Sequence, residues 1–217
     1  MNLFYTNISF RHIFSYFTGR TSLFRKYQTE FIQELGPQFS GKVIELGGEK
    51  KYNHYQYFAN ADSFICSNVN RDYDMYLDIT NMKEFEDESV ENFICLSVFE
   101  HLKEYQQGIS EIFRVLRPGG KLLFTVPFLY PYHDEIDYWR FTKDGLLEVF
   151  NQFEIIQMVQ LGGLFSTLSD FLQRPKGNYQ KRYFVYKLIG FFIAFLGHFL
   201  DTEDSYPLGY GLYAIKK

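Results

Sequence analysis

Short, nearly continuous apolar runs alternate with helical patterns from residue 42 onward, and this alternation constrains the fold most strongly. The runs that we interpret as strands are residues 42–46, 63–69, 89–97, 121–127, 154–161 and 212–217. Helical spacing separates several of them, for example in Tyr105–Leu116 and Thr142–Phe150. Strands without polar alternation are typical of a parallel sheet that helices cover on both faces. The sequence therefore predicts an α/β, doubly wound, mainly parallel sheet.

Two helical stripes precede the first predicted strand. The first lies in Ser9–Thr18, where Phe10, Ile13, Phe14 and Phe17 follow helical spacing. The second begins after Thr21 or Ser22, either of which suits a helix N-cap, and ends at Gly36-Pro37. We therefore expect a helical cap over residues 1–40 and a sheet domain over 41–217, with a helical insertion over 171–204 before the last strand.

Composition narrows the class of protein. The chain has 217 residues and a formal net charge of −4, so we expect one domain with an appended cap and no nucleic-acid partner. Cys66 and Cys95 fall in apolar runs and are expected to be reduced core thiols. No cysteine and histidine spacing typical of a metal site is present, so no metal is predicted. The first residues lack the apolar stretch of a signal peptide, and a cytoplasmic location is the expectation.

One segment invites a membrane interpretation. Leu188–Leu200 is apolar, but 13 residues of helix span only about 20 Å, which is too short for a bilayer. Basic residues precede it, and no acid occurs from Phe171 to Leu200. We favour a cap helix packed on the domain, and a peripheral membrane contact through residues 174–200 stays open.

The first strand ends in a turn suited to a ligand. Glu45 closes the run, and Gly47 and Gly48 follow it. Ligands of doubly wound sheets bind beyond the carboxyl ends of the strands, where glycines let the backbone approach. The adjacent glycines do not fit G-x-G-x-x-G, which argues against a nicotinamide oxidoreductase.

Polar residues also follow the next strands. Asn68 and Asn70 end the second run and are candidates to accept ribose hydroxyls, or they form a simple polar turn. Asp78 and Ile79 are candidates for the amine and face of an adenine, or Asp78 caps a helix.

Four ordered blocks carry a family resemblance. They read VIELGG, DIT, LSVFEHL and RVLRPGGKLLFTVP. With them, residues 42–150 resemble a class I S-adenosylmethionine-dependent methyltransferase of the methyltransferase type 11 kind. The resemblance implies a Rossmann-like sheet of about seven strands with an antiparallel final strand. It also implies S-adenosylmethionine as cofactor and S-adenosylhomocysteine as product.

The resemblance assigns cofactor roles to particular residues. The Gly47-Gly48 turn would hold the methionine part, and Glu45 would orient that turn or accept from the ammonium. Asn68 or Asn70 would take the ribose, and Asp78 with Ile79 the adenine. Leu96 and Ser97 would line the sulfonium side. Glu49 stands where the family has a second glycine, and asparagine replaces its ribose acid.

The segment Val126–Thr142 is the predicted acceptor side. It follows a strand end and reads VPFLYPYHDEIDYWRFT. Methyl transfer to a hydroxyl needs a base, so His133 is the candidate base and Asp137 its orienter or alternative. His101 is more often a structural residue than a base. The PFxYPxH…DYxRF pattern resembles methyltransferases associated with surface-glycan genes.

The preferred function is therefore O-methylation of a sugar or another small hydroxyl acceptor. An N-methylated amine stays open. The alternative is a non-catalytic, membrane-peripheral or partner-binding module on a degenerate methyltransferase fold. The sequence does not determine the oligomeric state.

Overall fold

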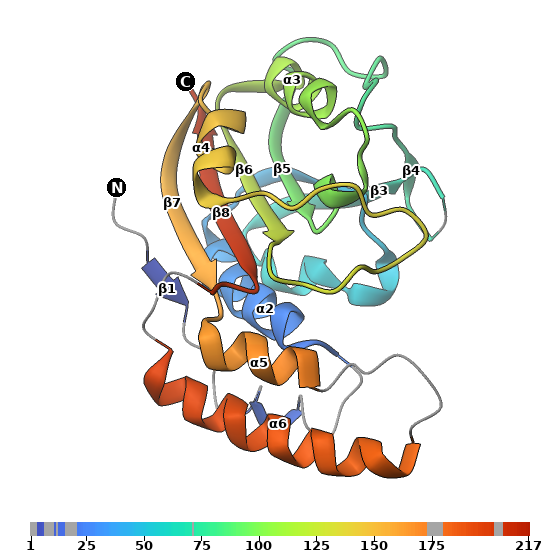
Figure 1. Ribbon diagram of the computed structural model, residues 1–217. Helices are drawn as coiled ribbons and strands as arrows, with labels where there is room; N and C mark the ends of the chain where they lie inside the picture. The colour runs from blue at the N-terminus through green and yellow to red at the C-terminus, as the bar shows by residue number, and fades with distance from the viewer. Residues whose placement is uncertain are drawn as a thin grey trace.

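One mixed sheet organises the chain, as the computed structural model shows (Figure 1). The structure describes residues 4–6, 11, 13–15, 21–70, 72–172, 180–201 and 206–217. The strands are β1 (Phe4–Thr6), β2 (Gly41–Leu46), β3 (Ala61–Asn68), β4 (Met75–Tyr76), β5 (Val90–Leu96), β6 (Leu116–Pro127), β7 (Phe153–Leu161) and β8 (Gly209–Lys216). Their order is β1-β7-β8-β6-β5-β2-β3-β4. Only β8 runs antiparallel to its neighbours, β6 and β7, which confirms the predicted sheet and its antiparallel final strand.

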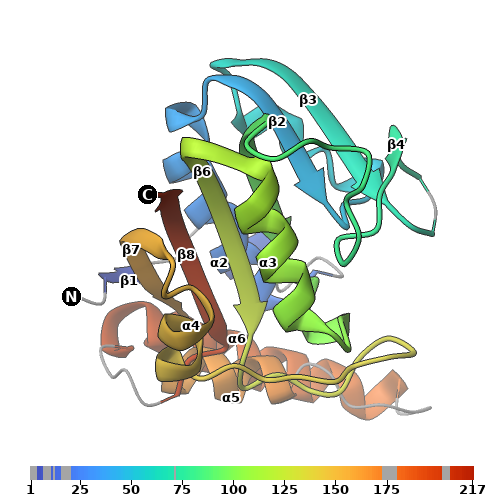
Figure 2. The same cartoon turned by 90° about the horizontal axis from the view of Figure 1, so that it is seen from above.

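Helices cover both faces of this sheet (Figure 2). They are α2 (Leu23–Leu35), α3 (Tyr105–Val115), α4 (Lys143–Val149), α5 (Leu164–Leu172) and α6 (Gln180–Leu200). One buried cluster joins α3 and α4 to the sheet through residues such as Ile112 and Phe150. A second cluster joins α2 to the other face through Tyr27 and Phe31. The fold is therefore Rossmann-like and doubly wound.

The N-terminal region combines the predicted helix with a strand that the sequence did not indicate. Helix α2 begins after Ser22, whose Oγ accepts a hydrogen bond from the backbone of Arg25 at 3.2 Å. Strand β1 pairs in parallel with β7 and makes the sheet eight-stranded. Its aromatic and β-branched residues suit a strand, and the pairing covers an exposed sheet edge. The expected Ser9–Thr18 helix lies mostly outside the described residues.

Two local details differ from the predicted elements. The segment after β2 with helical potential forms two short 3₁₀ turns, η2 (Lys50–Tyr52) and η3 (His54–Tyr57). Asn53 separates them in a left-handed conformation with φ of 54°, so no continuous helix forms there. Strand β6 begins at Leu116, and a register shift against β5 accommodates the Arg117–Gly120 turn.

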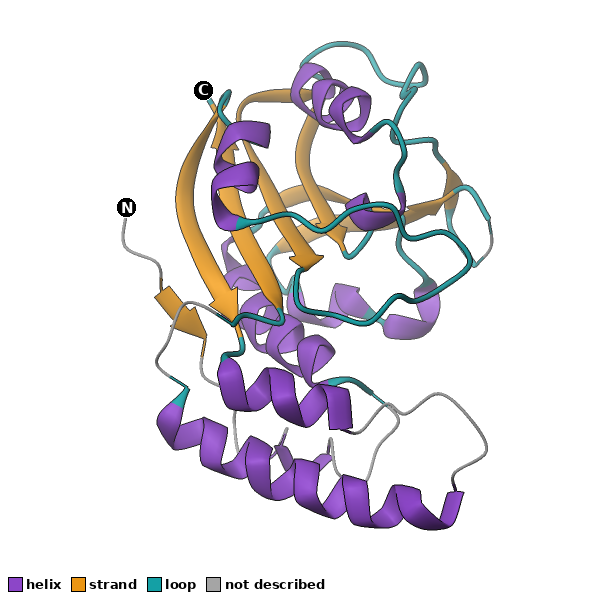
Figure 3. Cartoon of the chain, viewed as in Figure 1, coloured by secondary structure: helices purple, strands orange, loops and turns teal. Residues whose placement is uncertain are grey.

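Helices α5 and α6 form a layer beyond the carboxyl ends of β6 and β7 (Figure 3). The Asp201 carboxylate accepts the backbone N–H groups of Phe165 and Ser166 at 2.7 and 2.9 Å, which caps α5. Asp170 of α5 accepts the backbone N–H of Leu23 at 2.9 Å and so ties this layer to α2. Among the described helices, none has both the length and the apolar character to cross a membrane.

Candidate functional site

The strand order reverses between β2 and β5, which makes their carboxyl ends the topological switch point of the sheet. Strand β2 pairs with β3 on one side and β5 on the other, so connections diverge there. Such a switch point is where doubly wound sheets bind ligands. Glu45 and Leu46 lie opposite Ile94 and Cys95, which puts the glycine turn beside Leu96 and Ser97.

The glycine turn is closely packed by the protein itself. Gly47 has φ of +67°, and a Cβ there would lie 2.7 Å from Val98 Cγ2. A Cβ at Gly48 would lie 2.3 Å from the Glu45 carboxyl carbon. Buried Glu45 in turn pairs with His54 Nδ1 at 2.6 Å. The turn therefore requires glycines because side chains fill the space around it, and Glu45 orients it from below.

Asn68 holds the same turn from β3. Its Nδ2 donates to the Gly48 carbonyl at 2.7 Å, and its Oδ1 accepts the backbone N–H of Asn70 at 3.1 Å. The Gly48 N–H donates to the Ser67 carbonyl at 3.0 Å. The backbone groups of Gly48 and the amide of Asn68 are thus already paired within the protein.

Asp78 and Ile79 follow β4 in the place that the sequence predicts. Asp78 Oδ1 accepts from the backbone N–H and the hydroxyl of Thr80 at 2.9 and 2.7 Å. Ile79 is buried and packs near the position of Gly108 in α3. This is the turn-forming role that an Asp before Thr commonly takes.

Ser97 occupies a strained position at the end of β5. Its φ is +58°, a conformation that a non-glycine residue adopts rarely. Ser97 Oγ accepts from Gln28 Nε2 at 3.0 Å, and the same nitrogen donates to Thr125 Oγ1 at 2.5 Å. Gln28 of α2 therefore links the ends of β5 and β6.

The loop of residues 128–142 is fastened over η4 (Phe99–His101) by backbone hydrogen bonds. The N–H groups of Tyr138 and Trp139 donate to the Glu100 carbonyl at 2.7 and 3.2 Å. Trp139 Nε1 donates to the Leu102 carbonyl at 2.9 Å, and His101 Nδ1 to the Ile136 carbonyl. These contacts hold the predicted acceptor segment over the end of β5.

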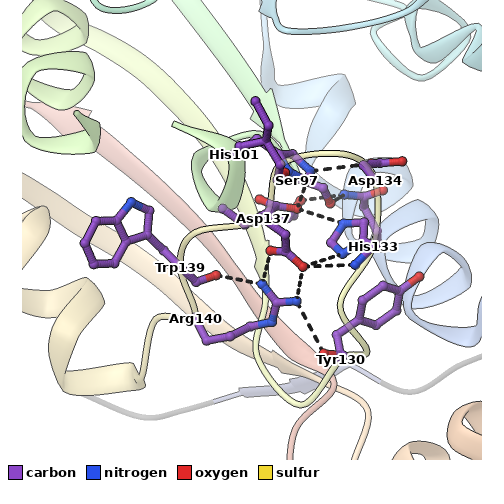
Figure 4. Close-up of polar contacts among 12 residues, drawn as sticks. Ser97, His101, Tyr130, His133, Asp134, Asp137, Trp139 and Arg140 are labelled. Carbon is purple, nitrogen blue, oxygen red and sulfur yellow. Dashed lines mark hydrogen bonds and ion pairs between the residues drawn. The ribbon is translucent and has the colours of Figure 1, made fainter. Parts of the chain in front are cut away.

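His133, Asp137 and Arg140 form one group within that loop (Figure 4). Asp137 accepts the backbone N–H of His133 at 3.0 Å, and its Oδ2 lies 3.2 Å from His133 Nδ1. Both Asp137 oxygens also accept from the Arg140 guanidinium, at 2.6 Å from Nη2 to Oδ2 and in a second short contact from Nη1 to Oδ1. Asp137 therefore lies where it could orient the His133 ring, although His133 Nδ1 makes no hydrogen bond to a described residue.

Neighbouring charges and burial shift the pKa values of Asp137 and His133 in opposite directions. Burial raises the pKa of Asp137, but Arg140 and the His133 N–H outweigh it and lower that pKa to about 2. Burial lowers the pKa of His133, but the carboxylates of Glu100, Asp137 and Asp134 raise it above its ordinary value. An Asp137 carboxylate held by an arginine is a poor base, so His133 is the better candidate of the two.

A cavity of about 380 Å³ opens beside this loop. It lies between the start of α2, the 3₁₀ turns after β2 and the loop of residues 128–142. Its lining is mostly polar and aromatic: Thr21, Ser22, Arg25, Gln28, Thr29, Tyr52, His54, Tyr57, Tyr130, His133 and Asp134. The volume falls in the range of small-molecule sites. Of the two predicted catalytic residues, His133 lines the cavity and Asp137 does not; Tyr130 and Asp134 of the predicted acceptor segment also line it.

Sequence reasoning missed several groups at this site. Arg25 and Gln28 of α2 line the cavity, and the sequence pattern singled out neither of them. Glu100 was visible only as part of the FEH block, yet its side chain is fully buried. A buried acid next to a histidine was the one signal that could have singled it out.

Comparisons with known proteins agree with this fold. A family model described as a methyltransferase domain matches residues 59–124. No curated protein matches the chain.

Three solved structures illustrate the similarity. A SAM-dependent methyltransferase from Archaeoglobus fulgidus has a TM-score of 0.60 at 14% identity, covering 96% of this chain and 100% of the other. Geranyl diphosphate C-methyltransferase from Streptomyces coelicolor, solved with S-adenosyl-L-homocysteine, has a TM-score of 0.61 at 10% identity, covering 100% and 91%. The [4+2]-cyclase SpnF has a TM-score of 0.58 at 16% identity, covering 91% and 83%.

At these identities the structures show a shared fold. Over residues 59–124 the chain thus resembles a methyltransferase domain, within a fold that SAM-dependent methyltransferases share.

Proposed function

We propose that this protein transfers the methyl group of S-adenosylmethionine to a hydroxyl of a small polar acceptor, with a sugar as the preferred class. When bound, the cofactor supplies an electrophilic methyl group on its sulfonium. The observation that carries the acceptor class is the lining of the cavity. Hydroxyl, amide, imidazole and guanidinium groups surround it beside three tyrosine rings, which suits a hydroxyl-rich ligand with flat faces.

We propose that the cofactor lies at the switch point between the carboxyl ends of β2 and β5. Leu96 and strained Ser97 line one side of it, and the Glu45-supported turn at Gly47 forms the other. Gly48 and Asn68 hold the shape of the turn, because their polar groups are paired with each other and with their neighbours. Asn70, Asp78 and Ile79 remain candidates for the ribose and adenine ends.

At the acceptor end, His133 is the group that we propose to activate the hydroxyl. It lines the cavity, and Asp137 faces its Nδ1. We therefore propose that Nε2 is the nitrogen that faces the acceptor hydroxyl. Correct placement of the attacking oxygen supplies much of the rate for a methyl transfer, and removal of its proton supplies a further part.

Titration calorimetry with S-adenosylhomocysteine tests the cofactor part directly. We expect saturable binding with one site per chain, and the absence of both heat and a thermal shift would contradict the proposal. With methyl-labelled S-adenosylmethionine and a panel of hexoses and nucleotide sugars, label should appear in an acid-stable ether. His133→Ala should keep the affinity for S-adenosylhomocysteine and lose label transfer at least tenfold, as expected for an acid–base group. A non-catalytic module would transfer no label to any acceptor.

A second candidate role concerns the outer face of α6. Phe192 and Phe199 there are 57% and 59% exposed, and Val185 is 55% exposed. The sequence of the first part of this helix contains Lys181, Arg182 and Lys187 and no acid. We propose that this face rests on an anionic membrane surface, which would suit a lipid-linked acceptor.

Flotation with phosphatidylserine vesicles at low salt tests the membrane role. We expect the protein to co-float, and Phe192→Ser combined with Val185→Ser to reduce the floated fraction several-fold. Co-flotation that both substitutions leave unchanged, or no co-flotation, would remove this role without affecting the methyltransferase proposal.

A further inference from the structure

The Glu100 carboxylate is the least satisfied polar group in the part of the chain that the structure describes. The side chain has no exposed area, and neither of its oxygens has a hydrogen-bond partner among the described residues. Its backbone is fixed, because the Glu100 carbonyl accepts from Tyr138 and Trp139. A buried charge is costly unless it is paired or coordinates a metal, so this carboxylate calls for a partner.

Two imidazole nitrogens lie around one of its oxygens. Glu100 Oε1 is 3.7 Å from His101 Nε2 and 3.8 Å from His133 Nε2. These distances exceed those of hydrogen bonds, which end near 3.2 Å. Ligand atoms of the three residues all lie within 4.8 Å of one another. Around an ion with bonds of about 2.0–2.2 Å, neighbouring ligand atoms are about 3–3.6 Å apart, so a small contraction closes the site.

Both rings turn Nε2 toward this point. His101 Nδ1 meets the Ile136 carbonyl, which only accepts, so Nδ1 carries the proton and Nε2 keeps its lone pair in the neutral ring. His133 Nδ1 lies 3.2 Å from Asp137 Oδ2 without forming a hydrogen bond, so among the two rings only that of His101 is held by one at Nδ1. A carbonyl or a carboxylate on the far ring nitrogen is the usual support of a metal-binding histidine.

We propose that Glu100, His101 and His133 bind a divalent transition-metal cation. Two imidazoles and one carboxylate suit ions such as Mn²⁺ and Zn²⁺ better than Mg²⁺, which prefers oxygen ligands and its own water. Asp134 offers a further oxygen, since its Oδ2 lies 3.7 Å from His101 Nε2 and its side chain is 74% exposed. Three protein ligands leave coordination positions for water or a ligand.

This proposal departs from the expectation of no metal. The sequence shows no compact cysteine and histidine spacing, because His101 and His133 belong to different segments. The hydrogen bonds that fasten the loop of residues 128–142 over η4 bring them together. A ligand set assembled from two segments leaves no local motif.

The site also gives His133 a more specific role at the acceptor end, and this step rests on the proposed function. His133 and Asp134 line the cavity, so the cation would lie at its edge. A hydroxyl bound to a divalent cation loses its proton to water more readily. His133 would then act on the acceptor through the cation and not as a free base.

Calorimetric titration of the untagged, chelator-treated full chain with MnCl₂ tests the metal site, and mass spectrometry counts the bound ions. We expect one ion per chain. Glu100→Gln and His133→Ala should each weaken binding at least tenfold. His198→Gln is the matched control, since His198 lies on α6 away from the cluster, and it should bind as the unmodified protein does. Titrations with ZnCl₂ and MgCl₂ compare the metals.

Two results would overturn the site. One is binding of neither Mn²⁺ nor Zn²⁺, or binding of Mg²⁺ alone. The other is binding that both Glu100→Gln and His133→Ala retain, which would place the ion elsewhere. His133→Ala changes a loop residue, so it remains informative if the Glu100 variant does not fold. S-adenosylhomocysteine titrations on the same samples separate a failed metal site from a failed methyltransferase proposal.

Discussion

Two polar regions lie at the same edge of the sheet and differ in how their groups are satisfied. Around the glycine turn, Gly48, Asn68 and Glu45 are paired with one another or with close neighbours. Around η4, the Glu100 carboxylate is buried without a hydrogen bond from the described chain. Polar groups that satisfy each other stabilise the fold by themselves, whereas a buried group without a partner is evidence for a missing ligand.

This difference assigns distinct roles to the two regions. The turn is a preformed, closely packed shape at the carboxyl end of β2. In our proposal, the second region is a set of ligand atoms that a bound cation would complete. Substitutions in the turn should therefore lower stability directly, whereas those in the second region should act through an added cation.

The largest effect should come from Gly47→Ala. The added Cβ combines a strained φ of +67° with a 2.7 Å approach to Val98 Cγ2. We expect a loss of about 2–5 kcal/mol in the free energy of unfolding, measured by urea denaturation. Gly119→Ala is the matched control: its φ is +75°, but no atom lies within 4 Å of the new Cβ. Its free energy of unfolding should fall by the cost of the backbone strain alone, about 1–2 kcal/mol. Equal losses would show that the turn is not tightly packed.

Added cation should have the next largest effect. At 100 times its Kd, Mn²⁺ should raise the free energy of unfolding by about 2.7 kcal/mol, because it binds the folded chain and not the unfolded one. Glu100→Gln should abolish this gain, while Asn68→Ala should keep it. A gain of the same size in the Glu100 variant would disconnect the stabilisation from this cluster.

The sequence was informative wherever one segment determines its own structure. The Ile109 and Ile112 spacing correctly predicted α3, but Leu116 was expected in that helix and is the first residue of β6; of Thr21 and Ser22, the two expected caps, Ser22 caps α2. The doubly wound sheet followed from the apolar strands, since their burial on both faces is a local property. Strand β1 was missed because three residues carry too little pattern to identify a strand.

The site was only partly predictable because its groups face each other across the fold. Asn68 was expected at the ribose or in a polar turn, and no pattern shows that its amide is paired with the Gly48 carbonyl. His133 was singled out by its type, but its approach to Glu100 depends on how the loop folds back over η4. Which polar groups are paired is a tertiary property that spacing does not encode.

Asn68→Ala should have a moderate effect on the turn. It removes a hydrogen bond to the Gly48 carbonyl and another from the Asn70 N–H. We expect a loss of about 1–2 kcal/mol in urea denaturation and a parallel loss of affinity for S-adenosylhomocysteine. Asn70→Ala is the control for stability alone, since Asn70 is exposed and its backbone N–H remains. An Asn68 variant that loses affinity at full stability would instead make Asn68 a direct cofactor contact.

The smallest effect should come from Asp74, which supports the turn from the β3–β4 connection. Its carboxylate pairs with Lys50 at 2.6 Å and accepts the Cys66 N–H at 3.0 Å, and these bonds lower its pKa below the ordinary 3.8. A lowered pKa stabilises the fold above pH 3.8, and this contribution is lost as the pH falls through the folded-state value.

Because the pair is exposed, Asp74→Asn should cost no more than about 0.5–1 kcal/mol at pH 7. At pH 3, urea denaturation should give the variant and the unmodified protein the same free energy of unfolding. Glu84→Gln, an exposed acid without a resolved partner in the described contacts, is the comparison and should change little at either pH. If the Asp74 variant and the unmodified protein still differ in free energy of unfolding at pH 3, the contribution of Asp74 comes from its shape at the turn and not from its charge.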